Sequence, residues 1–326
     1  MAVVTGDGRL GVRFFFVISG FLITWLLLSE SASPPGKSVS LKDFYIRRAL
    51  RILPIYFVYL AVIALVAPFH QSAMAWIGNL TFNTNIFMVG GLTVHLWSLA
   101  VEEQFYLIWP GVFVLFALYR NLRRSLWLLA VPILIGPLSR LIACKQYYPE
   151  SLAWYFRYSA TTSPTTSYFD SIAVGCVAAM LLFHKRMEVK QFLTVNFSKW
   201  LPACLLMLVL PMLWLQIHFP ARLQALFSDS MQAFAFSLLL LDSVLNPDRT
   251  FYRFLNNRLI CQIGVLSYSL YIWQQIFCTS YFWLPQRHFW WLSFPGWLVP
   301  TFLVAAVSFY CLERPLFRLR SRFRHT

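Results

Sequence analysis

The chain has 326 residues, of which 59% are hydrophobic and only 12% charged, and its mean hydropathy is +0.62. Soluble domains carry about 25% charged residues, so this composition excludes a water-soluble globular protein and predicts that lipid solvates much of the surface. The net charge of +15 does not indicate nucleic-acid binding, because the basic residues lie in short segments between apolar runs rather than on one clustered face.

Nine apolar runs are long and apolar enough to be candidate membrane helices. The expected fold is an all-α, polytopic transmembrane helix bundle in a single domain over residues 1–326. Between the runs, 72–92 is interrupted by Gly and Asn and is expected to be interfacial or re-entrant, whereas 144–167 is expected to be a polar, aromatic loop. In chain order the expected spans are 11–28, 51–68, 97–118, 125–143, 168–183, 200–218, 229–245, 260–283 and 296–313.

Lys and Arg are unevenly distributed between alternate loops. One set holds twenty of them and the opposite set holds four, so the positive-inside rule predicts that the first set and the C-terminus are cytoplasmic. Nine spans then place the N-terminus outside, although residues 1–10 contain neither a signal peptide nor a span. We expect a missing first helix to be the simpler account. The basic loops are 29–51, 119–125, 184–199, 246–259 and 314–326; the opposite loops are 69–96, 144–167, 219–228 and 284–295.

Two arginines lie at the cytoplasmic mouth of the second expected span. Arg48 and Arg51 are three residues apart and therefore share a helix face. Two guanidinium groups on one face can bind phosphate bidentately, which would suit a phosphorylated donor such as a coenzyme A thioester. The alternative is that they anchor the helix to anionic headgroups.

A row of polar side chains opens the third expected span from the outside. His95, Ser98 and Glu102 follow helical spacing, and Tyr106 extends the row by one turn. An imidazole, a hydroxyl and a carboxylate on one face can relay protons or bind sugar hydroxyls, and Glu103 adds a second carboxylate. The alternative is a solvated helix start, where acidic residues are favoured.

Two later spans also carry polar side chains. Asp170 enters a span from the outer side, where it either caps the helix or takes part in function. Ser267 and Tyr271 are four residues apart, and Gln274 follows after three more. These side chains either line a polar cavity or hold neighbouring helices together.

The remaining charged and sulfur-containing residues favour structural interpretations. Glu313 and Arg314 are adjacent at the inner end of the last span, and we interpret them as a structural pair that fixes the helix end, with a functional role as the alternative. The six cysteines show no CxxC or Cys/His metal spacing. They are expected to be small buried hydrophobic residues, and no metal site is expected.

Taken together with the run 11–24, which contains Phe14-Phe15-Phe16-Val17-Ile18-Ser19-Gly20, these blocks resemble the acyltransferase 3 family. The order of the blocks and their membrane sides match the family over nearly the whole chain, to about residue 315. The resemblance implies a ten-helix core and O-acylation of carbohydrates, commonly acetylation. It also implies an acyl-CoA donor on the cytoplasmic side, engaged by Arg48 and Arg51, with acetyl-CoA as co-substrate and no permanently bound cofactor.

The sequence departs from the family pattern in two places. The family's catalytic base is a His on a first helix, and this sequence begins after the position of that His. The expected explanations are a mis-assigned start, a fragment or a degenerate, inactive gene. Gln274 stands where the family often has His. Among the residues present, the candidates for catalysis are His95, Ser98, Glu102 and Glu103, and the candidates for substrate binding are Tyr106, Asp170, Ser267 and Tyr271.

The resemblance implies a multi-pass enzyme of the bacterial inner membrane. It would transfer an acetyl group to a hydroxyl of an exopolysaccharide, peptidoglycan or another exported or lipid-linked glycan, with the lipid bilayer as its environment and no nucleic-acid partner. One alternative is a non-catalytic or degenerate membrane subunit of polysaccharide synthesis. The other is a transporter or flippase, a class in which inverted repeats are common, and the sequence shows no internal repeat.

Overall fold

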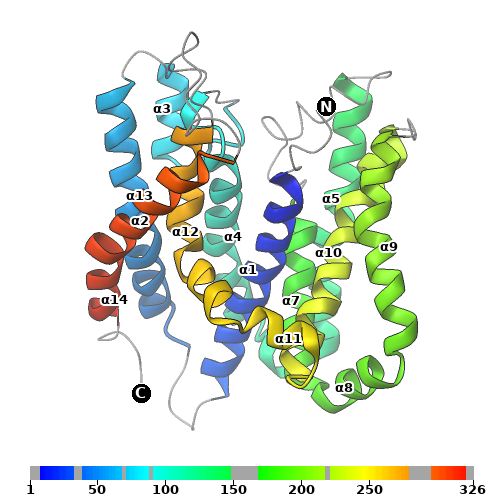
Figure 1. Cartoon of the computed structure of the whole chain (residues 1–326). Helices are drawn as coiled ribbons and strands as arrows, with labels where there is room; N and C mark the ends of the chain where they lie inside the picture. Colours follow the sequence, from blue (N-terminus) through cyan, green and yellow to red (C-terminus); the bar gives the residue numbers. More distant parts are fainter. Residues whose placement is uncertain are drawn as a thin grey trace. The chain divides into compact units, whose positions relative to one another are not determined.

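The computed structural model describes residues 8–32, 39–67, 71–87, 91–147, 168–216, 221–278 and 295–320. The described part is helical throughout its regular structure and contains no strand (Figure 1). Each of the nine predicted ranges overlaps a helix, so the expected all-α bundle is confirmed. The described residues divide into two compact units; whether they form one functional domain stays a prediction.

Unit 1 comprises Met1–Val39, Asn85–Met88 and Trp97–Tyr252, and unit 2 comprises Ser40–Thr84, Val89–Leu96 and Arg253–Thr326. The helices of unit 1 are α1 (Gly8–Ser31), α4 (Leu96–Leu115, from Trp97 onward), η2 (Leu118–Arg120), α5 (Leu122–Tyr147), α7 (Phe169–His184), α8 (Arg186–Val195), α9 (Phe197–Gln216) and α10 (Ala221–Leu245). Those of unit 2 are α2 (Leu41–Val66), α3 (Ala73–Leu80), η1 (Gly91–Thr93), α12 (Arg258–Cys278), α13 (Leu298–Ser308), a π-helical turn (Phe309–Glu313) and α14 (Arg314–Arg320). The short α11 (Thr250–Leu255) lies at the boundary in sequence.

Helix length and composition confirm a membrane protein but not the count of nine spans. Within the described ranges four segments are each long and apolar enough to cross a bilayer, and α8 with α9, which meet at 87°, form a bent fifth candidate. Two of the remaining helices do not qualify as spans for local reasons. The helix α7 has only 16 residues, and Glu102, Glu103 and Gln104 make α4 more polar. The four segments are Leu10–Ser31, Leu41–Val66, Leu122–Ile142 and Leu298–Phe317.

Close backbone packing joins α1 to α7 in unit 1. A Cβ atom added at Gly20 would lie 2.0 Å from the carbonyl oxygen of Ile172, and one added at Gly175 would lie 2.0 Å from that of Val17. Small residues allow membrane helices to approach at such distances. The glycines therefore set the separation of these two helices.

Side-chain contacts show that α1 and α7 run in the same direction. Phe16 packs against Tyr168 before the start of α7, with ring centroids 5.9 Å apart, and Trp25 packs near the other end of α7 against Phe183 at 6.2 Å. The predicted alternation of loops requires this parallel direction, since both helices follow loops of the outer set.

Replacing Gly20 with Ala is expected to destabilise the protein by roughly 1–3 kcal/mol, because the new methyl group must displace the α7 backbone. Gly111 in α4 is the matched control, since a Cβ atom there meets nothing within 4 Å, and Ala is favoured over Gly in a helix interior. Thermal melting of the purified variants checks the difference. Equal melting temperatures for Gly20→Ala and Gly111→Ala would contradict the packing described.

In unit 2, α2 and α12 lie side by side and also run in the same direction. The Tyr268 hydroxyl of α12 donates to the Ile52 carbonyl at 2.9 Å, and further along both helices Trp273 packs edge-on against Tyr59 at 5.5 Å. This parallel pair again agrees with the predicted order of loops, in which both helices follow basic segments.

The interrupted segment after α2 folds back onto that helix. The hydroxyl of Tyr56 donates to the Asn79 carbonyl at 2.8 Å, and the hydroxyl of Tyr59 donates to the Leu92 carbonyl at 2.7 Å. The Asn79 amide donates to Thr93 Oγ1 at 3.1 Å. The described part of this segment contains the short helix α3, turns and the 3-10 turn η1, and it fixes the position of the residue that follows, His95. An interfacial or re-entrant position stays a prediction.

Candidate functional site

His95 is buried in unit 2 among aromatic rings. Its Nε2 lies 3.1 Å from the carbonyl oxygen of Ile272, and its ring packs edge-on against Tyr59 with centroids 5.5 Å apart. A third ring, that of Tyr271, lies 5.4 Å away, and the Tyr271 hydroxyl donates to the backbone carbonyl of His95. α2 and α12 therefore hold the imidazole from two sides.

The partner of Nε2 assigns the tautomer of His95. A carbonyl oxygen only accepts hydrogen bonds, so Nε2 carries the proton and Nδ1 of the neutral ring carries the lone pair. Nδ1 is buried and makes no hydrogen bond within the part of the chain that the structure describes. Burial lowers the pKa of His95 to about 3, so the ring is neutral and Nδ1 keeps its lone pair as an acceptor.

The paired arginines lie on the same helix as Tyr59. Arg48 is half-buried and Arg51 is exposed. Eleven residues separate Arg48 from Tyr59, which places them on the same face of α2 about 16 Å apart along its axis. One face of α2 therefore leads from a guanidinium near its start to the aromatic ring that contacts His95.

Glu313 is not paired with Arg314, so this expectation was wrong. The buried Glu313 carboxylate accepts a hydrogen bond from Ser269 of α12, while the Arg314 guanidinium lies over the Tyr310 ring at 5.7 Å. Glu313 ends the π-helical turn and Arg314 begins α14, and the two side chains contact different partners.

The two residues expected to bind substrate on α12 differ in burial. Tyr271 is half-buried against His95, whereas Ser267 is exposed. Ser269, two residues later, is the buried hydroxyl that bonds Glu313. Because a helix turns by about 100° per residue, Ser267 and Ser269 lie on nearly opposite faces, and the buried face is that of Ser269.

In unit 1, Glu102 of α4 is the centre of a buried trio. Its carboxylate accepts a hydrogen bond from Ser19 of α1 at 2.5 Å and another from Tyr106, one turn along α4. Glu102 is 3% exposed and Ser98 is also buried, whereas Glu103 is half-buried. The predicted row of Ser98, Glu102 and Tyr106 therefore faces the interior of unit 1.

The predicted row of His95, Ser98 and Glu102 is divided between the two units. His95 directly precedes the first residue of α4, and its described contacts are with residues of unit 2. Glu102 and Tyr106 have described contacts within unit 1, including the Ser19 hydroxyl. A common site for these residues stays a prediction.

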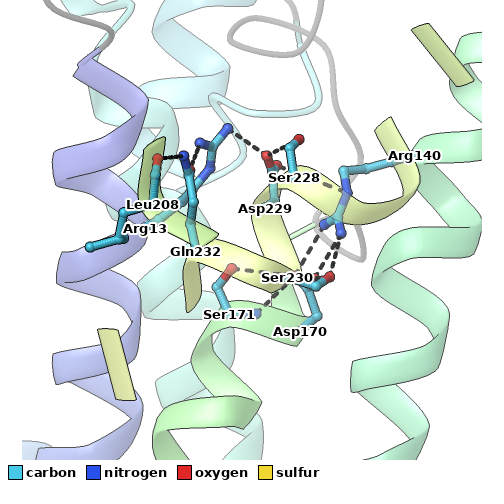
Figure 2. Close-up of polar contacts among 9 residues, drawn as sticks. All are labelled: Arg13, Arg140, Asp170, Ser171, Leu208, Ser228, Asp229, Ser230 and Gln232. Carbon is cyan, nitrogen blue, oxygen red and sulfur yellow. Dashed lines mark hydrogen bonds and ion pairs between the residues drawn. The ribbon is translucent and has the colours of Figure 1, made fainter. Parts of the chain in front are cut away.

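Asp170 belongs to a buried charge network that Figure 2 shows. Arg140 of α5 donates to both carboxylate oxygens of Asp170, at 3.1 and 2.8 Å, and Ser230 of α10 donates to the same carboxylate at 2.6 Å. Oδ1 also accepts the backbone N–H of Ser171 at 2.8 Å. Asp170 is not the N-cap residue of α7; its carboxylate is held chiefly by an arginine from another helix.

The network continues to α1 through a second acidic residue. Asp229 of α10 lies 3.9 Å from Arg140 Nε and 2.5 Å from Arg13 Nη2, and Arg13 also donates to Gln232. All four charged groups are buried, and their signs alternate along the chain of contacts. Two arginines and two aspartates thus connect α1, α5, α7 and α10 with no net charge.

Our sequence-based interpretation missed Arg13, Arg140 and Asp229 as partners of Asp170. Each lies in or at the edge of a predicted span, where a charge is costly unless it is paired. That signal could have marked them as a group with no net charge. Their pairing could not be read from one sequence, because the four residues come from four helices.

Comparisons with known proteins identify a family and several named relatives. A family model described as an acyltransferase domain, acyltransferase 3, matches residues 2–313. The peptidoglycan O-acetyltransferase OatA of Listeria monocytogenes is 26% identical over 334 residues, covering 95% of this chain and 51% of the relative. The O-acetyltransferase OatA of Staphylococcus aureus is 26% identical over 333 residues, covering 95% and 52%. The putative peptidoglycan O-acetyltransferase YrhL of Bacillus subtilis is 25% identical over 343 residues, covering 95% and 50%.

The chain spans about half the length of the curated relatives it matches. No solved structure matches it. The similarity therefore extends over nearly all of this chain but describes only part of each relative, and the activities named for the relatives belong to those longer proteins.

Proposed function

This chain belongs to the acyltransferase 3 family, and on that premise we propose that it is an integral membrane O-acetyltransferase that transfers an acetyl group from acetyl-CoA to a glycan hydroxyl. The relatives named as peptidoglycan O-acetyltransferases support an exported glycan such as peptidoglycan as the acceptor class. Their names do not favour an exopolysaccharide acceptor. We keep the bacterial inner membrane, a cytoplasmic C-terminus and a cytoplasmic donor as parts of this proposal.

The observation that carries the proposal is the orientation of His95. Its Nε2–H donates to the Ile272 carbonyl, which leaves Nδ1 as the buried base. The ring packs against Tyr59 of α2, the helix that also carries Arg48. Acyl transfer from a thioester needs a base for the hydroxyl proton and cations for the donor phosphates. Unit 2 supplies both types of residue, with the arginines on α2 and His95 packed against Tyr59 of that helix.

The proposed reaction proceeds in two steps. Phosphates of the donor bind Arg48 and Arg51, and His95 Nδ1 takes the proton of the acceptor hydroxyl as its oxygen bonds to the thioester carbon. The carbon–sulfur bond then breaks, and the proton passes from His95 to the departing thiolate. The products are an acetyl ester and free coenzyme A, so atoms and charge balance.

In unit 1 we propose that Ser98, Glu102, Glu103 and Tyr106 bind glycan hydroxyls, and in unit 2 we propose that Tyr271 contacts the substrate beside His95. The proposal for unit 1 is supported by the row of hydroxyl and carboxylate groups that α4 turns to the interior of that unit, since such polar groups orient a bound ligand. For Asp170 we propose a structural role instead, since its carboxylate is already bonded by Arg140 and Ser230.

Acetyl-labelled acetyl-CoA added to membranes containing the chain tests the function. The expected result is label in glycan that mild base releases as acetate, as an ester requires. A transporter or a non-catalytic subunit of polysaccharide synthesis leaves the glycan unlabelled, and that result would reject the proposal.

The donor assignment predicts that replacing Arg48 and Arg51 together with Ala abolishes measurable coenzyme A binding. Charge-assisted bonds to phosphate are each worth about 1.5–3 kcal/mol, so losing two raises Kd by more than a hundredfold. Lys42→Ala is the matched control, since Lys42 is an exposed cation in the first turn of the same helix. Calorimetric titration with coenzyme A checks all three proteins, and equal Kd values would show that the arginines only anchor the helix.

A further inference from the structure

Trp273 of α12 has a buried indole N–H without a hydrogen-bond partner in the described residues. The side chain is 7% exposed. Two other buried tryptophans behave differently: the Trp109 N–H donates to Thr24 at 3.0 Å and the Trp200 N–H to the Leu193 carbonyl at 2.9 Å. A buried donor without an acceptor is costly and needs an explanation.

The unpartnered N–H belongs to the same ring cluster as His95. Trp273 directly follows Ile272, whose carbonyl binds His95 Nε2. The rings of Trp273 and His95 both pack edge-on against Tyr59, each with its centroid 5.5 Å from that of Tyr59. Within the described residues of unit 2, His95 Nδ1 and Trp273 Nε1 are both buried without a hydrogen bond. Gln71 Nε2 and Ser308 Oγ are also buried without one, but neither belongs to the ring cluster around Tyr59.

The pair formed by His95 Nδ1 and Trp273 Nε1 is complementary to the reacting groups of acyl transfer. When a hydroxyl attacks a thioester, the hydroxyl must lose a proton, and the thioester carbonyl oxygen becomes negatively charged. A base accepts the hydroxyl proton, and a fixed N–H donor stabilises the negative charge on the carbonyl oxygen. Tyr59 and Tyr271 cannot serve as that donor in the observed arrangement, because their hydroxyls already donate to the carbonyls of Leu92 and His95.

We propose that Trp273 Nε1–H is the oxyanion donor of the transfer reaction, an inference that rests on the proposed function. As the acceptor oxygen bonds to the thioester carbon, the electron pair of the C=O bond moves to oxygen, and the indole N–H binds this oxyanion. His95 Nδ1 holds the hydroxyl proton meanwhile. The C=O bond re-forms when the carbon–sulfur bond breaks, and the proton passes to the coenzyme A thiolate.

The substitution Trp273→Phe tests this role because it removes the N–H and keeps an aromatic ring. The expected result is a fall in kcat of about 100- to 1000-fold, the range for loss of one oxyanion donor. The Kd for coenzyme A should stay within twofold of wild type. The melting temperature should equal or exceed that of wild type, because the variant loses a donor that has no partner in the described residues.

Trp200→Phe is the matched control. Its N–H binds a backbone carbonyl in unit 1, so its loss should lower the melting temperature and leave kcat unchanged. A Trp273→Phe protein with wild-type kcat, or one whose lower rate is accompanied by a lower melting temperature, would overturn the inference. Failure of the wild-type chain itself to label glycan would instead reject the proposed function.

Discussion

Replacing Asp170 with Asn is expected to destabilise the protein by about 3 kcal/mol, because it leaves the buried Arg140 guanidinium without its bidentate partner. Asp229 compensates the Arg140 charge only weakly, because its carboxylate lies 3.9 Å from Arg140 Nε and already binds Arg13. Denaturant unfolding in mixed micelles measures the change. Glu188→Gln is the control, since its ion pair with Lys185 is exposed and such pairs contribute less than about 1 kcal/mol.

Exchanging the two charges separates a structural role from acceptor binding. The double variant Asp170→Arg with Arg140→Asp restores the ion pair in reverse and is expected to recover part of the lost stability. If Asp170→Asn instead keeps wild-type stability and raises only the KM for the glycan, Asp170 binds substrate as the sequence analysis expected, and the structural assignment fails.

Replacing His95 with Gln is expected to lower kcat by about 10²- to 10⁴-fold, the contribution of a general base. The Gln side chain keeps an N–H that can donate to the Ile272 carbonyl, so the buried acceptor stays satisfied, but it has no basic nitrogen. Coenzyme A binding should be unchanged, because Arg48 and Arg51 are retained. Steady-state transfer rates and calorimetry check these two expectations.

His184→Gln is the matched control for the loss of an imidazole. His184 ends α7 in unit 1 and takes no part in the proposed chemistry, so its replacement should leave kcat unchanged. Transfer at the wild-type rate by the His95→Gln protein would show that another group is the base.

The helices were predictable because apolar length is a strong local signal. Each predicted range overlaps a helix, and the described part of the interrupted segment 72–92 contains the short helix α3 and the 3-10 turn η1. The predicted count of nine membrane crossings is not confirmed, because several of the described helices are too short or too polar to qualify as spans. The directions of the helix pairs α1–α7 and α2–α12 follow the predicted order of loops.

The site was only partly predictable, because helical spacing states which residues share a face but not what that face contacts. The residues Glu102 and Tyr106 form a contact as their spacing predicts. The partners Ser19 of Glu102 and Arg140 of Asp170 come from other helices, and no local pattern specifies them. On α12, the buried serine is Ser269 rather than Ser267. Its face of the helix contacts Glu313 in the π-helical turn that follows α13, and the spacing within α12 does not predict that contact.

The most direct test of the central claim uses sealed vesicles of known orientation and acetyl-labelled acetyl-CoA, which does not cross a bilayer. Inside-out vesicles expose the cytoplasmic face, and the account predicts that they form base-labile acetyl esters on enclosed glycan while releasing an equal amount of coenzyme A. Right-side-out vesicles should form none until the membrane is opened. Labelling from the outer face alone, or no ester from either orientation, would contradict transfer from a cytoplasmic donor by this chain.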